Sequence, residues 1–302
     1  MTPLKHEDLN MSVTASMVKE LRERTGSGMM ECKKALVASN GDIEVAIEEM
    51  RKSGAAKAAK KSGRIAAEGV VKILASDDNK KITMVEVNSE TDFAAKDTVF
   101  LAFTDKIVAQ AASLGTESVE ELMASEIDGE SVETIRTALV AKIGENIQVR
   151  RITQLSASEG VFGHYVHGVK IGVVVNVSSD NVDLAKDIAM HIAAVNPDYI
   201  AEKDVPSDVV EKEKEILIAQ VADSGKPPEI VEKMIGGRIR KFLAGITLYG
   251  QPFVKNPDMT VEKLLKSEGA EVIAFQRMEV GEGIEKKEDN FAEEVMAQAR
   301  GK

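Results

Sequence analysis

The chain has 302 residues, of which 43% are hydrophobic and 29% charged, values typical of a folded protein long enough for two or more domains. Its 39 Lys and Arg against 50 Asp and Glu give a net charge of −11, which argues against a protein that holds nucleic acid mainly by neutralising phosphates. The single cysteine, Cys32, excludes an intramolecular disulfide and suits a reducing cytoplasm, and no apolar run approaches the roughly 20 residues that a membrane helix needs.

The N-terminal part of the chain predicts an extension, a helical bundle and a linker. Residues 1–10 are polar and hold nothing that can pack, so we expect a disordered extension. Between 11 and 54, apolar residues recur at helical spacing in three runs, separated by the breaks Thr25–Gly28 and Ser39–Gly41. The basic stretch 55–64 favours a solvated helical linker, with a contact to an acidic partner or RNA as the alternative.

The middle of the chain contains the same pattern twice. Each copy has two strand-like runs joined by a turn, followed by an amphipathic helix. The runs cover residues 69–74, 81–87 and 100–112 in the first copy and 161–167, 171–177 and 183–194 in the second. We therefore expect a duplicated core of small antiparallel sheets with packed helices, comprising an N-subdomain 65–155 and a C-subdomain 156–283.

The remaining elements complete an α+β fold. A charged, helical region at 198–245, broken by Ser224-Gly225-Lys226-Pro227-Pro228, predicts a protruding helical hairpin inserted into the C-subdomain. Strands are expected again at 244–254 and 271–280. A polar amphipathic helix closes the chain within a C-terminal module, 284–302.

Motifs for nucleotide binding are incomplete. Gly245 and Gly250 have the spacing of a phosphate-binding loop, but Gln251-Pro252 follow where Lys-Ser/Thr is required. The Gly26-Ser27-Gly28 sequence lacks the third glycine and the preceding strand of a dinucleotide-binding turn. We expect no direct nucleotide binding and no cofactor.

The titratable side chains do not form a catalytic or metal-binding pattern. His164 and His167, three apart in a strand, point to opposite faces and cannot share a metal ion. His191, on an apolar helix, is interpreted as a hydrogen-bonded core histidine, and Cys32 as an inert thiol. We therefore expect no catalytic residues, which places an enzyme last among the possible functions.

The segment Thr91-Asp92-Phe93-Ala94 belongs to the first copy of the repeat and is absent from the second. Asp92 could cap a helical turn while Phe93 packs into the core. Alternatively, the turn presents Phe93 to a partner's pocket, because aromatic anchors carry much of the energy of small interfaces. The residues alone leave both interpretations open.

Ordered motifs along nearly the whole chain from Met11 resemble the bacterial elongation factor Ts family. They are Val18–Gly26, Gly28–Met30, Cys32–Leu36, Asn40–Ile43, Met50–Gly54, Val87-Asn88 with Thr91–Phe93, Lys142–Asn146, His167-Gly168, Gln251–Phe253 and Gly281–Ile284. The hairpin and the final helix resemble the long form of the factor. The family usually has Cys where this chain has Ser89, a change that we expect to be neutral.

The resemblance implies a guanine nucleotide exchange factor for the GTPase elongation factor Tu, acting in the elongation phase of protein synthesis. The three-helix bundle, similar to ubiquitin-associated domains, would dock on the GTPase through Met29 and Met30. The segment 91–94 would dislodge Mg²⁺ from the partner, with Phe93 inserting between partner helices and Asp92 supporting it. Ile143, Gly144 and His167 match further contact positions, the final helix would also touch the partner, and the complex could assemble as a dimer.

Three function classes are possible: an exchange factor, a generic interaction module and an enzyme, of which the enzyme comes last. The exchange factor leads, because it accounts for both the bundle and the one-sided insertion in the duplicated core. A generic interaction module, such as a ubiquitin-type or RNA-associated adaptor, would explain the bundle alone. Release of labelled GDP from elongation factor Tu separates these classes.

Overall fold

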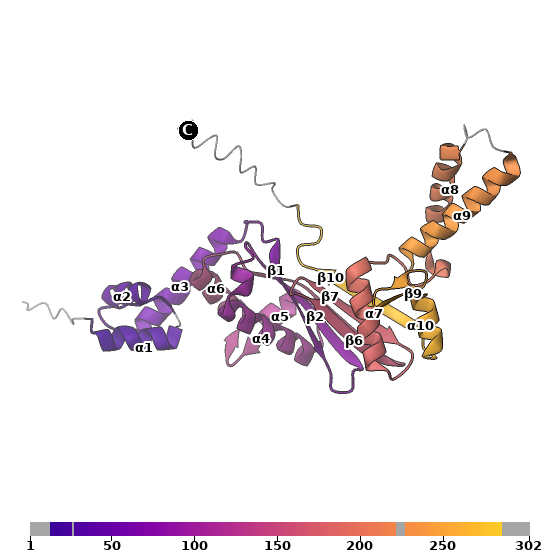
Figure 1. Cartoon of the computed structure of the whole chain (residues 1–302). Coiled ribbons are helices and arrows are strands. Elements are labelled where there is room, and N and C mark those ends of the chain that lie inside the picture. The colour runs from indigo at the N-terminus through magenta and orange to yellow at the C-terminus, as the bar shows by residue number, and fades with distance from the viewer. Residues whose placement is uncertain (1–12, 26, 222–226, 286–302) are drawn as a thin grey trace, which may run out of the picture.

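The structure is a computed structural model that describes residues 13–25, 27–221 and 227–285. A helical bundle lies at one end, a core of two sheets in the middle, and a helical hairpin projects at the other end (Figure 1). This mixed helix and sheet architecture confirms the predicted α+β class. The predicted extension 1–10 and the predicted final helix lie outside the described residues.

The N-terminal bundle consists of three helices, as predicted. They are α1 (Ala15–Thr25), α2 (Met29–Ala38) and α3 (Ile43–Lys61). Leu21, Cys32 and Leu36 are fully buried between them. Asp42 caps α3 because its carboxylate accepts a 3.0 Å hydrogen bond from the backbone amide of Val45. The helix then continues without a break through most of the predicted linker.

Several basic residues of α3 pair within the chain. Lys57 lies 3.0 Å from the carboxylate of Glu31, and Arg51 pairs with Glu130. The ammonium group of Lys61 donates to the carbonyl of Gly144. Because Lys57 and Lys61 already have partners in this chain, these contacts favour the helical linker over a contact to an acidic partner or RNA.

The core consists of two three-stranded antiparallel sheets with the same topology. The first sheet has the order β1-β2-β5 and the second β6-β7-β10, with a helix after the second strand of each. Their elements are β1 (Glu68–Ala75), β2 (Lys81–Ser89), α4 (Thr98–Leu114) and β5 (Gln148–Ser156), then β6 (Val161–His167), β7 (Ile171–Val177), α7 (Val182–Val195) and β10 (Val272–Glu279). The predicted strand–strand–helix units are confirmed, and each gains a third strand. Of these, β10 was predicted and β5 was not.

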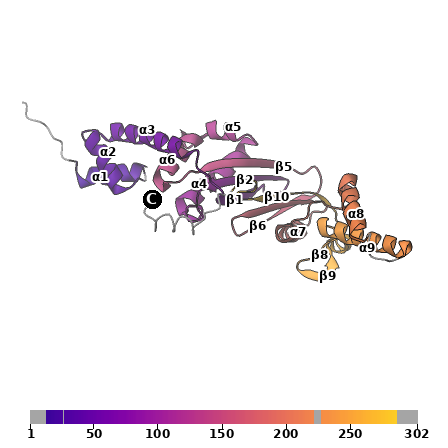
Figure 2. The ribbon, with the colours of Figure 1, turned by 90° about the horizontal axis from the view of Figure 1, so that it is seen from above.

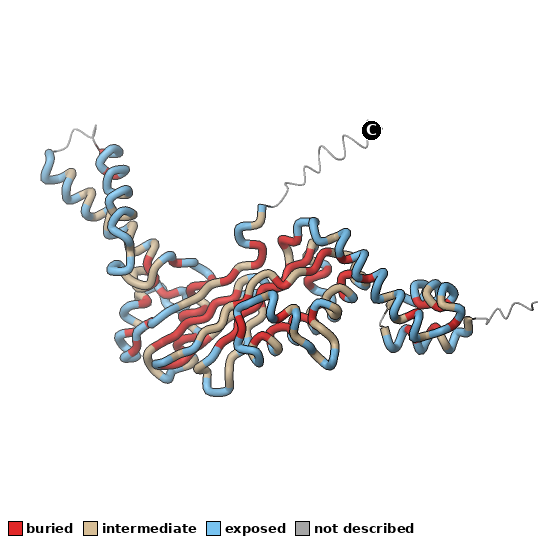
Figure 3. The backbone as a smooth tube through the Cα atoms, turned by 180° about the vertical axis from the view of Figure 1, so that it is seen from behind, coloured by how far each residue is buried: buried red, intermediate tan, exposed pale blue. Residues whose placement is uncertain are grey.

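The sheets pack face to face and each carries its helix on the outer face, so the core has four layers (Figures 1 and 2). On β1, Val70 packs toward α4 whereas Val71 packs against the second sheet. On β7, Val174 faces the first sheet while Val173 and Val175 face α7. Burial on both faces explains why these strands are nearly continuous apolar runs, and Figure 3 shows the buried residues along them.

Each copy of the repeat contains an insertion between its helix and its third strand. The first insertion contains α5 (Val119–Ala124), β3 (Glu126–Ile127), β4 (Glu130–Ser131) and α6 (Val132–Ile143). The second contains η2 (Glu202–Asp204), the hairpin of α8 (Ser207–Val221) and α9 (Pro228–Ile246), and then β8 (Pro252–Phe253), β9 (Asn256–Thr260) and α10 (Val261–Ser267). The hairpin agrees with the prediction and projects away from the core (Figure 2).

The predicted strand 244–254 is wrong. Helix α9 runs on to Ile246, and the chain then turns before the short strand β8. The apolar residues of this stretch are buried for a different reason: Leu248 is fully buried in the core of the second lobe, and Phe253 packs beside it. An apolar run that crosses from a helix end into a loop has no single period, so its pattern resembled a strand.

His191 is the hydrogen-bonded core histidine that the sequence predicts. It is fully buried; Nδ1 accepts from the amide of Val254 at 3.3 Å, and Nε2 lies 2.9 Å from Oε1 of Gln251. Because Nδ1 accepts, Nε2 carries the proton and donates to Gln251. Burial lowers the pKa of His191, and the Gln251 contact opposes that shift. The imidazole is therefore neutral at pH 7 and serves packing.

Candidate partner-binding site

Phe93 stands on a short turn between β2 and α4 with its ring in solvent. The residue is 81% exposed, the largest exposed fraction among the large apolar side chains of the described residues. The 3₁₀ turn η1 (Ala94–Lys96) follows at once. In the isolated chain, the exposed ring gains no free energy from apolar burial. Its position therefore indicates a surface used for binding. Of the two sequence interpretations, packing of Phe93 into its own core is wrong.

The backbone beneath Phe93 is fixed by several hydrogen bonds. The hydroxyl of buried Ser89 donates to the carbonyl of Thr91 at 2.9 Å, and the amide of Ala95 donates to the same carbonyl at 3.3 Å. The amide of Ala94 donates to Oγ1 of Thr91 at 3.3 Å. The side chain of Ala94 is buried, so it anchors the turn and does not present a surface.

Asp92 pairs with Lys96 one turn later, with 2.7 Å between Oδ2 and Nζ. The hydrogen bond from Lys96 lowers the pKa of Asp92, and the charges of Lys96 and Lys170 lower it further. Asp92 is therefore ionised at neutral pH, and its carboxylate is already paired with Lys96. The Asp92–Lys96 ion pair spans the turn that carries Phe93.

The structure brings two predicted contact segments together. Thr91 bonds to Glu145, the residue that follows Ile143 and Gly144 in sequence. Gly144 ends α6 in the left-handed conformation (φ 90°), which glycine adopts without strain. Ile143 is half-buried against the core of the first lobe, so it offers only part of its side chain to the surface.

His167 lies at the turn between β6 and β7, on the other lobe. It is exposed, and its Nδ1 lies 3.3 Å from the hydroxyl of Tyr165. The turn meets the first lobe, because the amide of Val71 donates to the carbonyl of Val169 at 2.8 Å. Lys170, in the same turn, pairs with Glu68 at 2.6 Å, and Glu68 lies opposite Ser89, the residue at the base of the Phe93 turn. His167 thus belongs to the side of the molecule that carries the Phe93 turn.

Met29 and Met30 lie apart from this group, in the N-terminal bundle. They form the first turn of α2 and are 60% and 64% exposed. The long helix α3 connects the bundle to the core (Figure 1). The predicted site residues therefore occupy two surfaces, one on the bundle and one around Phe93.

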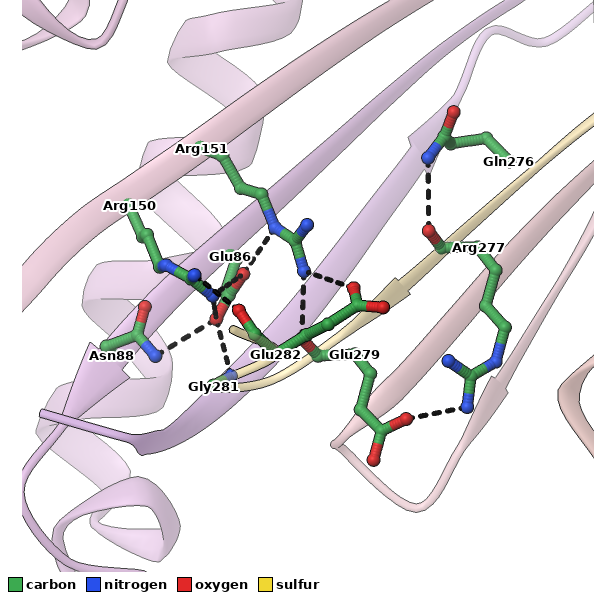
Figure 4. Close-up of polar contacts among 9 residues, drawn as sticks. All are labelled: Glu86, Asn88, Arg150, Arg151, Gln276, Arg277, Glu279, Gly281 and Glu282. Atoms are coloured by element: carbon green, nitrogen blue, oxygen red, sulfur yellow. Dashed lines mark hydrogen bonds and ion pairs between the residues drawn. The ribbon is translucent and has the colours of Figure 1, made fainter. Parts of the chain in front are cut away.

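A buried polar cluster, which no sequence motif predicted, lies where the chain leaves β10 (Figure 4). The carboxylate of Glu86, fully buried on β2, accepts from Arg150 at 3.1 Å, from Arg151 at 2.5 Å and from the backbone amide of Gly281 at 2.8 Å. The pairing of β2 with β5 shifts register here, so that both consecutive arginines reach one carboxylate. Burial opposes ionisation of Glu86, but these donors together lower its pKa.

A cleft of about 860 Å³ is lined by residues of the bundle and of α6, both basic and acidic, including Lys34, Glu49 and Lys142. Within residues 13–25, 27–221 and 227–285, no group of three or more His, Cys, Asp or Glu could hold a metal ion. None of the helices described in those ranges is long and apolar enough to cross a membrane.

The structure thus presents an exposed aromatic turn on a core of two similar lobes. A family model described as elongation factor TS matches residues 90–282. The chain is 60% identical over 292 residues to elongation factor Ts of Thioalkalivibrio sulfidiphilus, covering 96% of this chain and all of that protein. It is 59% identical over 291 residues to elongation factor Ts of Methylococcus capsulatus, covering 96% of this chain and 99% of that protein. The chain belongs to the elongation factor Ts family.

Proposed function

We propose that this protein is a guanine nucleotide exchange factor for the GTPase elongation factor Tu. It binds the GDP-bound partner, displaces the partner's Mg²⁺ and promotes GDP release, so that GTP can bind during the elongation phase of protein synthesis. The observation that carries the proposal is the 81% exposure of Phe93 on a turn whose backbone is held from several sides. The factor contributes no catalytic residue and no bound nucleotide of its own.

Phe93 inserts between helices of the partner, and Asp92 and Thr91 hold the turn in shape while it does so. Burying one phenylalanine contributes roughly 1.5–3 kcal/mol, which is too little to overcome tight nucleotide binding alone. Several contacts must therefore act together. The factor needs only to bind the nucleotide-free partner better than the loaded one, and by reciprocity the nucleotide then weakens binding of the factor.

The other contacts divide between the two surfaces. Met29 and Met30 dock the bundle, which we propose to be a ubiquitin-associated-like domain, on the GTPase. Ile143, Gly144 and His167 add contacts beside the Phe93 turn. Ala94, whose side chain is buried, contributes through its backbone and through the shape of the turn.

The proposed units are the extension 1–10, the docking domain 11–54, the linker 55–64, subdomains 65–155 and 156–283 with the hairpin 198–245, and the module 284–302. Most of the linker is part of α3, so the docking domain is carried on a continuous helix. We place the protein in the cytoplasm, where elongation takes place, and propose that the factor and its partner can assemble as a dimeric complex.

The test is the release of fluorescently labelled GDP from elongation factor Tu as the factor is titrated. The proposal predicts a rate that rises with factor concentration, saturates, and is highest when Mg²⁺ is scarce. Binding without acceleration would support the generic interaction module instead. Failure to bind elongation factor Tu would refute both partner and mechanism.

A further inference from the structure

Thr91 is held by a carboxylate that lies 54 residues away in the sequence. One oxygen of Glu145 accepts the backbone amide of Thr91 at 2.9 Å, and the other accepts the Thr91 hydroxyl at 2.6 Å. Thr91 is two residues before Phe93 and its hydroxyl also accepts from the amide of Ala94. Glu145 therefore binds the turn at its base, on both the backbone and the side chain.

A second, reciprocal contact joins the same two segments. Glu90, the residue before Thr91, accepts the backbone amide of Asn146 at 2.6 Å. The two glutamates thus cross: each one accepts an amide from the segment that contains the other. With a single hydrogen bond, one segment could still rotate about that bond relative to the other. Two separate bonds resist this rotation.

The segment that holds Thr91 is itself tied to the end of α3. Asn146 is buried, and its side-chain amide donates to the carbonyls of Arg64 at 2.7 Å and Ser62 at 3.3 Å. Lys61 donates to the carbonyl of Gly144. The helix that carries the bundle, the 143–146 connection and the Phe93 turn therefore form one braced unit.

We propose that Glu145 is a positioning residue that holds the Phe93 turn in its binding-competent conformation. This inference rests on the proposed function and adds a residue to which no partner contact is assigned. The pair of bonds fixes Thr91, and Thr91 fixes the direction in which the ring of Phe93 leaves the surface. Without Glu145 the turn samples other conformations, and the fraction of factor able to insert the ring falls, which lowers the apparent rate of the step that needs it.

The replacements Glu145→Ala and Glu145→Gln separate geometry from charge. Alanine removes both acceptors. Glutamine keeps an acceptor for the Thr91 amide and offers an N–H to Thr91 Oγ1, which has a lone pair available. We expect Glu145→Ala, which removes two solvent-exposed hydrogen bonds, to lower the maximal rate of GDP release by about tenfold, and Glu145→Gln to restore most of it.

The matched control is Glu121→Ala. Glu121 accepts the hydroxyl of Thr116 at 2.6 Å, the same chemical contact at the same length, at the connection between α4 and α5. It touches none of residues 90–97, so this variant should keep the maximal rate of the unmodified factor. Equal losses in Glu121→Ala and Glu145→Ala would refute a specific role for Glu145.

Hydrogen exchange of the amides of residues 91–96 in the free factor provides a readout that needs no partner. We expect Glu145→Ala to speed that exchange about tenfold or more, and Glu145→Gln and Glu121→Ala to leave it nearly unchanged. Unaltered protection in Glu145→Ala would overturn the proposal, as would faster exchange combined with an unchanged rate of GDP release. If the unmodified factor itself fails to accelerate GDP release, the proposed function falls, and the exchange data still decide whether Glu145 orders the turn.

Discussion

The carboxylate of Glu86 accepts a 2.8 Å hydrogen bond from the backbone amide of Gly281, across 195 residues of sequence. Arg150 also donates from Nη2 to the carbonyl of Glu282, and Arg151 donates to the carbonyl of Glu279 at 2.8 Å. A central strand of the first lobe is thereby fastened to the end of the last strand of the second. The cluster holds the two lobes in register where the chain leaves the core.

Glu86→Gln should destabilise the protein by about 3 kcal/mol at pH 7, because it leaves two arginines without their buried counter-charge. Denaturant unfolding followed by circular dichroism measures the change. Glu282→Gln is the control, since Glu282 is half-exposed and lies 3.3 Å from Arg151, and it should cost less than about 1 kcal/mol.

The same pair predicts a pH dependence with a definite sign. The pKa of Glu86 is lowered on folding from its ordinary value of 4.5, so its contribution to stability is complete above that pH and is lost as pH falls through the folded-state pKa. The difference in unfolding free energy between the unmodified protein and Glu86→Gln should shrink as pH falls below 4.5. A difference that stays constant through this range would mean that the charge of Glu86 is irrelevant.

Gly172→Ala should destabilise the sheet–sheet interface by about 1–3 kcal/mol. A Cβ at this position would lie 2.5 Å from Cγ1 of Val71 and 3.2 Å from Cδ1 of Ile73, both in the opposite sheet. Val71 is buried and β-branched, so it has little freedom to move aside. Gly63→Ala is the control, because its added Cβ meets nothing within 4 Å. Thermal melts that coincide for the two variants would refute the close packing described for Gly172.

Replacing Met29 and Met30 together by Asp should weaken binding to elongation factor Tu by at least about tenfold, because burial of each methionine contributes roughly 1.5–3 kcal/mol. Both positions lie in the first turn of α2, where negative charge is compatible with the helix dipole, so the bundle should remain folded. Isothermal titration calorimetry measures the affinity, and the Met29→Leu, Met30→Leu double variant should bind normally. Unchanged affinity of the Asp variant would exclude this face from docking.

Local patterns in the sequence predicted the parts of the fold that depend on local periodicity. The paired strands around residues 70–87 and 161–177, their following helices and the hairpin were all predicted, because the strands are short apolar runs bounded by turn residues and the helices keep one helical period. Strand β5 was missed, since the register shift at Arg150 interrupts its alternation and places two charged residues together. The prediction of a strand at 244–254 was wrong for a related reason, because this stretch crosses the end of α9.

In the candidate site too, features of the local sequence were predicted, whereas contacts between residues far apart in the sequence were not. An aromatic residue beside a carboxylate, in an insertion present in one copy of the repeat, was visible in the sequence, and Phe93 is indeed exposed. The contacts that hold its turn were not visible, because Glu145 and Thr91 are 54 residues apart and neither has an unusual neighbourhood in sequence. The buried hydroxyl of Ser89, expected only to be a neutral replacement, supports the turn through the carbonyl of Thr91.

The central claim is that the exposed ring of Phe93 promotes nucleotide release from elongation factor Tu. The most direct measurement compares the maximal rate of labelled-GDP release with the unmodified factor and with Phe93→Ala, after circular dichroism has shown equal melting temperatures. Because the ring makes little contact within its own chain, folding should be unaffected, and the rate should fall by about tenfold to a hundredfold, as loss of roughly 1.5–3 kcal/mol of burial requires. Equal rates for the two proteins would contradict the account.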